Sequence, residues 1–280
     1  MAKVSVLVAL YRPNTGHLKQ AIDSILNQTF HDFEFLILDD CPEDNRERVV
    51  GSFKDSRIKY FKNDKNLGIA GTRNKLVQMA TGKYLAIMDH DDIAKPTRLE
   101  EQVHILDEHP KIGVVGCHIK LFPNNRIVRF PSDNDKIEDY LMQGCAIPHT
   151  GAMIRADILP DTPYEDKFSP AEDYALWCRL IGKTKFYNIP KALMQYRIHD
   201  NNTTKTQSDK MTSATHVIHD FVRREHSDIW NRVCQNTPHI IRMKLFGFIP
   251  LGHFKQIGKG RQGILKFLPF ITIKAKQEVQ

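Results

Sequence analysis

Short apolar runs alternate with amphipathic stretches through the N-terminal third of the chain, and this alternation limits the fold more than any other feature. Strand-like runs occur at Val4–Leu10, Phe33–Leu38, Ile58–Phe61 and Tyr84–Met88. Apolar residues recur at helical spacing after the first run (Leu18, Ala21, Ile22, Ile25) and after the fourth, behind Pro96 in a predicted first turn (Leu99, Val103, Leu106). Strands that alternate with helices form βαβ units. The sequence therefore predicts an α/β fold with a doubly wound, mostly parallel sheet.

The pattern becomes mixed after the first four strands. Short strand candidates occur at Gly151–Ile154 and Phe186–Ile189, around one clear helix. The 280 residues are 41% hydrophobic and 26% charged, which excludes a disordered or collagen-like chain and allows a large core. The five cysteines form no CxxC pair, as is typical of a reducing compartment without a zinc site. Val4–Leu10 is too short to span a membrane and no cleavage site follows it, so we expect neither secretion nor a membrane span.

The excess positive charge is concentrated at the C-terminal end. Residues 239–280 contain eight Lys and Arg against one Glu, which equals the net charge of +7 of the whole chain. Two apolar clusters flanked by cations, KLFGFIPLGHFK and KFLPFITIK, lie in the same tail. A basic tail on a neutral body indicates binding to an anionic membrane surface or to nucleic acid, and a tail that packs on the body or makes an oligomer contact is the alternative. Its GxGxxG match at 258–263 lacks the strand and helix of a dinucleotide site.

Acidic residues follow two of the four predicted strands. Asp39-Asp40 comes directly after the second strand, and Asp89-His90-Asp91-Asp92 follows the fourth. Parallel strands place their carboxyl ends at one edge of a sheet, where ligands bind, and carboxylates clustered there repel one another unless a cation compensates them. Mg²⁺ or Mn²⁺ suits carboxylate and phosphate oxygens together. A chance DxD match, whose acids only cap the next helix, is the alternative.

A second acidic pair begins a predicted helix further along the chain. Ser169 and Glu172 match a capping box, with Pro170 at the first helical position. Asp173 heads a stripe of apolar residues that we expect to face inward (Leu176, Trp177, Leu180). Partial burial raises the pKa of a carboxylate toward that of a useful general base, whereas interaction with the helix dipole needs only its charge. The residues alone leave both roles of Asp173 open.

The order of these motifs resembles the inverting family-two glycosyltransferases of the GT-A fold. The resemblance is carried by VSVLVALYRPN, QTFHDFEFLILDD, NLGIAGTRNKLVQMATGKYLAIMDHDD, AEDYALWCRL and YRIH, which span about residues 3–204. It implies that a nucleotide-sugar donor, expected to be a UDP-sugar, binds across the first half. It also implies a divalent metal on the donor diphosphate and a general base in the ED pair. The chain departs from the usual DDGS of the family, because it reads Asp39-Asp40-Cys41-Pro42.

The resemblance also implies roles for individual residues. Asp173 is the expected general base, and Asp91 and His199 are the expected ligands of Mn²⁺ or Mg²⁺. The expected donor-binding residues are Ala9, Tyr11, Asp39, Asp40, Arg73, Asn74 and Asp89, with Asp40 favoured for the base ring and Asp89 for the ribose. His149 and Glu172 are acceptor-side candidates, although a lone histidine is more often structural and Glu172 also fits the cap.

The expected organisation is a catalytic domain at 1–205 followed by a helical and basic extension at 206–280. Within the first domain, the donor half is expected at about 1–92 and the acceptor half at about 93–205. The resemblance implies transfer of a sugar to a glycan or lipid-linked acceptor in the biosynthesis of lipopolysaccharide, capsule or a similar cell-surface polysaccharide. Such an enzyme is expected in the cytoplasm, peripherally bound to the inner face of the plasma membrane through residues 239–280.

Three other functions compete with this one. A metal-dependent nucleotidyltransferase also uses acids at strand ends, but it leaves the Asp173 helix and the YRIH segment without a role. A nucleic-acid-binding protein would use the basic tail, yet the aromatic residues of the tail are all phenylalanine and no motif of that class occurs, so we expect no nucleic-acid partner. A non-catalytic relative is expected to have lost Asp91 or Asp173, and both are present.

Overall fold

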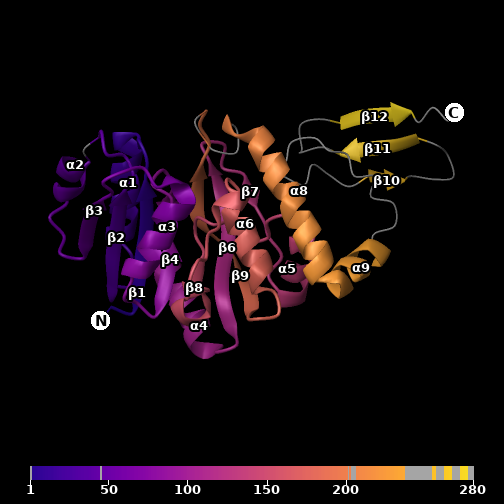
Figure 1. Cartoon of the computed structure of the whole chain (residues 1–280), viewed down its shortest axis with the longest axis horizontal. Coiled ribbons are helices and arrows are strands. Elements are labelled where there is room, and N and C mark those ends of the chain that lie inside the picture. Colours follow the sequence, from indigo (N-terminus) through magenta and orange to yellow (C-terminus); the bar gives the residue numbers. More distant parts are fainter. Residues whose placement is uncertain are drawn as a thin grey trace.

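A nine-stranded mixed sheet lies at the centre of the protein (Figure 1). The computed structural model describes residues 2–44, 46–200, 202 and 206–236, and the backbone of strands at 254–256, 262–266 and 272–276. The sheet has the order β3-β2-β1-β4-β8-β6-β9-β5, and β7 pairs with β6. Its strands are β1 (Val4–Leu10), β2 (Phe33–Asp39), β3 (Ile58–Lys62), β4 (Tyr84–Ile87), β5 (Ile93–Ala94), β6 (Ile112–Phe122), β7 (Ile127–Val128), β8 (Met153–Arg155) and β9 (Lys185–Arg197).

Helices cover both faces of this sheet. They are α1 (Thr15–Leu26), α2 (Glu47–Gly51), α3 (Gly68–Met79), α4 (Arg98–Glu108), α5 (Asn134–Leu141), α6 (Glu172–Leu180), α8 (Ser208–Glu225) and α9 (Ser227–Asn236), with 3-10 turns η1 (Ala156–Ile158) and η2 (Asp166–Phe168). The buried side chains form two cores, one under α1 and α4 and the other under α3, α5, α6, α8 and α9. The predicted doubly wound α/β fold is confirmed by this arrangement.

The alternation of side chains along β1 shows how the two cores arise. Val4, Val6 and Val8 pack in the core under α1 and α4, whereas Leu7 packs in the core under α3. Successive residues of a strand point to opposite faces, so a strand between two helical layers must be apolar on both. This requirement explains the continuous apolar run from which the first strand was predicted.

Strand direction divides the sheet into two regions. β1 pairs in parallel with β2 and with β4, and β2 pairs in parallel with β3. β8 runs antiparallel to both β4 and β6, while β6 and β9 are parallel. The predicted parallel first half and mixed second half are both confirmed. One detail is wrong: Pro96 does not lie in the first turn of α4, because Thr97 is the N-cap residue of that helix.

The chain after β9 continues with two helices that join the core beside α6 (Figure 1). Met211, Ile218 and Val222 of α8 are buried, and Ile229 of α9 packs in the same core. The predicted boundary at 205 stays a prediction, as do the halves at 1–92 and 93–205. In the described ranges, every helix is too short or too polar to cross a membrane.

The basic tail at 239–280 lies outside the described residues except for the backbone of three strands. These are β10 (Phe254–Gln256), β11 (Gln262–Lys266) and β12 (Thr272–Lys276), which pair antiparallel in this order. The end of the GxGxxG match falls within β11, in an antiparallel setting that differs from a dinucleotide-binding βαβ unit. The predicted membrane contacts of the tail therefore remain predictions.

Candidate active site

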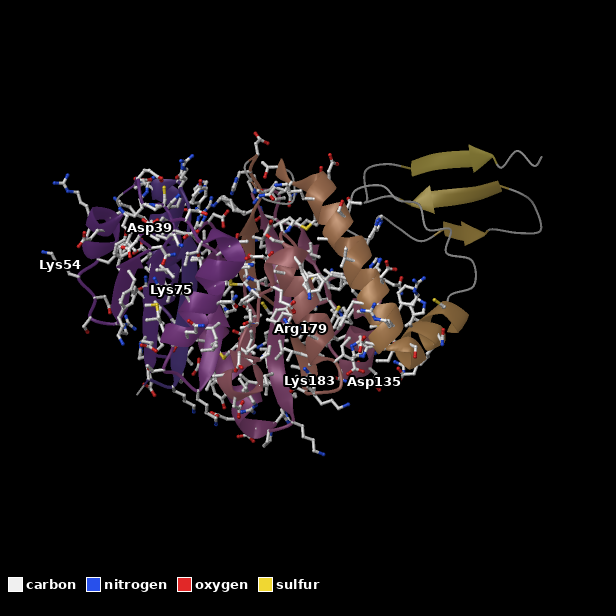
Figure 2. All side chains as sticks on the ribbon, in the orientation of Figure 1. Asp39, Lys54, Lys75, Asp135, Arg179 and Lys183 are labelled. Atoms are coloured by element: carbon white, nitrogen blue, oxygen red, sulfur yellow. The ribbon has the colours of Figure 1, made fainter. Side chains whose placement is uncertain are left out.

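The candidate site lies at the edge of the sheet where the parallel strands end. Figure 2 shows Asp39, the last residue of β2, at this edge, with Arg179 and Lys183 toward the opposite edge. Arg179 is in the last turn of α6, so the C-terminal end of this helix points away from Asp39. The first residues of α6 therefore lie on the same side of the sheet as Asp39. Acidic side chains that follow β2 and β4 and that begin α6 are thus presented on one side, where α/β sheets bind ligands.

Asp39 is buried, and both of its carboxylate oxygens accept hydrogen bonds from neighbouring residues. The Tyr60 hydroxyl donates to Oδ2 at 2.9 Å, and the Cys41 backbone N–H donates to Oδ1 at 3.0 Å. Burial, and then the Asp39 carboxylate, raise the pKa of the Tyr60 hydroxyl, which keeps it protonated as a donor. Asp39 therefore fixes the turn after β2 through two bonds.

Asp40 connects this turn to the loop that precedes α3. Asn63 Nδ2 and the Leu67 backbone N–H both donate to Asp40 Oδ1 at 2.8 Å. Asn66 Nδ2 donates to the backbone oxygen of Asp40 at 3.0 Å. The two acids thus hold together the two loops at which a nucleobase is expected, and a contact of either acid with the base stays a prediction.

Three of the expected donor-binding side chains line a common pocket. Ala9 at the end of β1, Arg73 on α3 and Asp89 after β4 contribute to its wall, together with Tyr164. Tyr11 does not line this pocket: it is 50% exposed, and the Arg12 guanidinium lies 5.3 Å from the centre of its ring. The structure therefore brings together three of the expected donor-binding residues and leaves Tyr11 at the surface.

The two expected metal ligands are in direct contact. His199 Nε2 is 2.7 Å from Asp91 Oδ2. Arg197 holds the acidic segment in place, because its Nε donates to the Asp91 backbone oxygen and its backbone N–H donates to Asp92 Oδ1, each at 2.8 Å. The His199 backbone N–H donates to Asn202 Oδ1 at 2.6 Å. The end of β9 thus delivers His199 to the acids after β4.

The chemistry of this pair fits a divalent cation. A carboxylate oxygen and an imidazole nitrogen that lie next to each other are suitable donors for Mn²⁺, and the carboxylate also suits Mg²⁺. Nowhere in the part of the chain that the structure describes do three or more His, Cys, Asp or Glu side chains form a group that could hold a metal. Hard cations are often held by one or two protein groups, with phosphate oxygens and water completing the coordination. Asp91 and His199 therefore fit a metal that is shared with a diphosphate.

Arg73 joins this pocket to the start of α6. Its guanidinium forms an ion pair with Glu172 and lies 3.5 Å from Asp89 Oδ1. Glu172 is 3% exposed, so its carboxylate cannot exchange Arg73 for water. The Glu172 and Asp89 carboxylates compensate the partly buried guanidinium from two sides.

The predicted capping box at Ser169 is wrong. Helix α6 begins at Glu172 with Ala171 as its N-cap residue, and Ser169 instead follows the 3-10 turn η2. Glu172 pairs with Arg73 rather than with the backbone before the helix. The Glu172 carboxylate is engaged by the partly buried Arg73 guanidinium, so it does not reach back to cap the helix.

Asp173 has the electrostatic environment of a general base. Burial, and then the negative charge of Glu172, raise the pKa of Asp173 to about 7, while the Arg73 charge opposes the shift. The Tyr174 backbone N–H donates to Asp173 Oδ1 at 2.7 Å. The stripe that follows is buried as predicted, in Leu176, Trp177 and Leu180. A carboxylate with a pKa near neutrality is both available as an anion and basic enough to accept a proton.

Asn74 makes contacts that the sequence did not indicate. Its Nδ2 donates to the Tyr164 backbone oxygen at 2.7 Å, and its Oδ1 accepts the Tyr164 backbone N–H at 3.0 Å. Both polar ends of this expected donor-binding side chain are engaged with the segment before η2.

The structure buries both acceptor-side candidates. His149 is 6% exposed, and its Nε2 lies 3.0 Å from the Tyr164 hydroxyl. Burial, followed by the Arg73 charge, lowers the pKa of His149 well below its usual value, so the ring is neutral. Glu172 is buried against Arg73. A contact of either side chain with an acceptor stays a prediction.

Sequence reasoning missed three residues that shape the site: Tyr164, His17 and Arg197. The Tyr164 ring centre lies 5.7 Å from the Arg73 guanidinium, and the His17 ring centre lies 5.7 Å from that of His199. Arg197 anchors the acidic segment. Arg197 stands in the YRIH segment, where an arginine beside a predicted metal ligand was a usable signal. No pattern around His17 or Tyr164 indicates their positions.

Comparison with known proteins defines the family. Residues 5–159, more than half of the chain, match the family model for glycosyl transferase family 2. The chain belongs to glycosyl transferase family 2. It is a glycosyltransferase, and the resemblance on which the residue roles were based is confirmed at the level of the family.

Several known proteins are similar to most of the chain. The uncharacterized glycosyltransferase MJ1057 of Methanocaldococcus jannaschii is 35% identical over 221 residues, which are 75% of this chain and 76% of that protein. The UDP-Glc:alpha-D-GlcNAc-diphosphoundecaprenol beta-1,3-glucosyltransferase WfgD of Escherichia coli is 28% identical over 223 residues, 78% of this chain and 86% of that protein. The structure of S. aureus TarS 1-349 in complex with UDP-GlcNAc has a TM-score of 0.66 at 18% identity, covering 83% of this chain and 71% of that one. The family 2 chain therefore has the predicted GT-A fold.

Proposed function

We propose that this family 2 glycosyltransferase is an inverting, metal-dependent enzyme that transfers a sugar from a UDP-sugar to a glycan or lipid-linked acceptor. The observation that carries the proposal is that Arg73 joins two acidic groups with different properties. On one side it lies 3.5 Å from Asp89, two residues before the Asp91–His199 pair. On the other side it binds Glu172, next to Asp173 with its pKa near 7. A metal-binding pair and a basic carboxylate at one edge are the two groups that inverting transfer requires.

Asp173 is the general base in this proposal. Its carboxylate accepts the proton of the acceptor hydroxyl while the hydroxyl oxygen forms a bond to the anomeric carbon. The bond between that carbon and the diphosphate oxygen breaks on the opposite face, so the configuration inverts. The raised pKa supports this role, because a carboxylate with the usual pKa near 4 is a weak base toward an alcohol.

Asp91 and His199 would hold Mn²⁺ or Mg²⁺ in the same proposal. When bound, such an ion supplies positive charge that stabilises the departing nucleoside diphosphate. Arg197 keeps Asp91 at the position where His199 meets it, through the bond from its Nε to the Asp91 backbone oxygen at 2.8 Å. Asp91 follows β4 and His199 follows β9, so the two proposed ligands meet only in the folded chain.

The donor is proposed to lie along the carboxyl edge, with its base near Asp39 and Asp40 and its ribose near Asp89. Arg73, whose side chain is 15% exposed, is placed to meet the donor with charge-assisted hydrogen bonds. The assignment of a UDP-sugar is supported by the donor in the name of WfgD and by the ligand in the TarS structure.

The acceptor is proposed to be a growing glycan, or a sugar linked to a lipid through a diphosphate, as in the name of WfgD. The basic tail at 239–280 would attract such a chain to an anionic membrane surface, in line with a peripheral position at the cytoplasmic face of the plasma membrane. The membrane role rests on the composition of the tail alone.

A donor panel tests the proposal. Purified protein with Mn²⁺ is incubated with nucleotide sugars that differ in base and in sugar, and release of the nucleoside diphosphate is followed with and without EDTA. We expect release from at least one UDP-sugar and its loss in EDTA. When a glycan acceptor is included, NMR of the glycoside formed should show an inverted anomeric configuration. Release that continues unchanged in EDTA contradicts the metal, and a retained configuration contradicts the role of Asp173. Asp173→Asn is assayed beside the wild-type protein. Asp166→Asn, which changes an exposed acid near α6, is its matched control.

A further inference from the structure

Two consecutive residues of α3 fasten the segment that leads to α6. Arg73 pairs with Glu172 across 99 positions of the chain, and Asn74 binds the backbone of Tyr164 across 90 positions. Helix α3 belongs to the proposed donor half, whereas Tyr164 and Glu172 belong to the proposed acceptor half. One turn of α3 therefore connects the two halves at adjacent points.

The Asn74 contact resembles the pairing of two strands. The side-chain amide donates to the Tyr164 carbonyl at 2.7 Å and accepts from the Tyr164 N–H at 3.0 Å. Two bonds to one peptide residue fix the direction of its backbone as well as its position. An ionised aspartate of the same size lacks the donor, and an alanine lacks both groups, so neither can make both bonds.

Tyr164, held in this way, lines the pocket beside Arg73. Its ring centre lies 5.7 Å from the Arg73 guanidinium, and outside the pocket its hydroxyl is 3.0 Å from His149 Nε2. It is 1% exposed, so packing allows its ring little freedom. The Arg73 guanidinium is consequently held by the Tyr164 ring as well as by the carboxylates of Glu172 and Asp89.

We propose that Asn74 and Tyr164 are positioning residues for the transfer reaction: Asn74 holds Tyr164, and the Tyr164 ring holds the Arg73 guanidinium at the wall of the donor pocket. This inference rests on the proposed function, and it replaces the direct contact of Asn74 with the donor that the family resemblance implies. A planar guanidinium presents its N–H groups usefully only in a fixed orientation. Displacement of such a group by about 1 Å can lower a rate by about 10²-fold.

A double-mutant cycle separates positioning from direct contact. Asn74→Ala, Tyr164→Leu and the double variant are compared with wild type in kcat and KM for the nucleotide sugar that the wild-type enzyme turns over. We expect each single variant to lower kcat/KM by about 10-fold to 10²-fold. The kcat/KM of the double variant should lie within about threefold of that of the less active single variant. Multiplied effects would show that Asn74 contacts the donor itself, which overturns the proposal. A lower melting temperature with unchanged kcat/KM would show a merely structural role, which also overturns it.

Matched variants complete the kinetic test. Gln78→Ala removes an exposed amide from the same helix and should leave kcat/KM unchanged. If Tyr164→Leu does not fold, Arg73→Lys takes its place in the cycle, because lysine keeps the charge and loses the planar guanidinium. Asn74→Ala should then add little to Arg73→Lys, and multiplied effects again overturn the proposal.

Hydrogen exchange tests the clamp independently of any donor. The Tyr164 amide donates to Asn74 Oδ1, so it should exchange slowly in the wild-type protein and in Gln78→Ala, and fast in Asn74→Ala. Fast exchange in the wild-type protein would overturn the clamp. If the wild-type protein turns over no nucleotide sugar, the proposed function fails, and the exchange experiment still decides whether Asn74 holds Tyr164.

Discussion

The imidazole of His199 lies 2.7 Å from the carboxylate of Asp91, although 108 positions separate the two residues in the chain. The contact exists because β9 ends beside the segment that follows β4. Arg197, the last residue of β9, donates to the Asp91 backbone oxygen at 2.8 Å, and the His17 ring of α1 packs against His199 with 5.7 Å between ring centres. Two elements, β9 and α1, therefore hold this pair in place.

The pair leads to a prediction about the metal. His199→Ala and Asp91→Asn should each weaken the binding of Mn²⁺ in the presence of UDP, because each removes one of two protein donors. Transfer should fall by about 10²-fold or more, since metal stabilisation of a leaving group contributes several kcal/mol. Isothermal titration of Mn²⁺ into protein with UDP measures the first effect. His31→Ala, at an exposed histidine, is the control, and wild-type metal affinity in both test variants would contradict the site.

A second prediction concerns Asp173. Asp173→Asn preserves the size of the side chain and removes the proton acceptor, so kcat should fall by about 10²-fold to 10⁴-fold while the affinity for UDP stays near that of wild type. Initial rates at saturating donor, together with a UDP titration, measure both quantities. Asp166→Asn, on an exposed acid of η2, should keep its kcat. A larger loss in the control than in Asp173→Asn would refute the assignment of the base.

The pH dependence of kcat provides a third prediction. Asp173 must be ionised to accept a proton, so kcat should rise with pH and level off above its pKa of about 7. Glu172→Gln removes the like charge that raises this pKa, so the rise should move to lower pH. Rate profiles from pH 5 to 9 show the direction of the shift. Glu165→Gln, which breaks the ion pair with Arg179 on the outer side of α6, should leave the profile in place.

The stability of the protein should change with pH through the same residue. The folded pKa of Asp173 is about 7 and its ordinary value is 3.8, so the folded state binds the proton more tightly than the unfolded state. Wild type is therefore expected to lose up to about 4 kcal/mol of stability from this group as the pH rises from 4 to 7. Asn cannot ionise, so Asp173→Asn should melt at a higher temperature than wild type at pH 8, and the difference should shrink at pH 4.5. A constant difference across this range, measured by calorimetry, would contradict the raised pKa.

The sequence predicted the parallel first half closely because its signals are local. The apolar run Val4–Leu10 is β1 without change, and Leu18, Ala21, Ile22 and Ile25 are all buried on α1. The prediction of a capping box at Ser169 was wrong because Glu172 pairs with Arg73. This partner is 99 positions away, and no local pattern reveals it. The same holds for the engagement of Asn74 with Tyr164. Motifs thus located the acids of the site, while the long-range contacts that orient them emerged only from the packing of α3 against the segment before α6.

The basic tail supports the last prediction. The body of the chain is neutral overall, and residues 239–280 carry the whole excess of +7. Each cation near an anionic leaflet contributes about 1 kcal/mol, and the apolar clusters of the tail can add buried area beside the charges. We expect the full chain to sediment with vesicles that contain phosphatidylserine, to be released by high salt, and to ignore vesicles of phosphatidylcholine alone. A chain that ends at Thr237 should lose this binding and still glycosylate a soluble acceptor. Equal binding to both kinds of vesicle would contradict an electrostatic attachment, and unfolding of the shortened chain would show instead that the tail packs on the body.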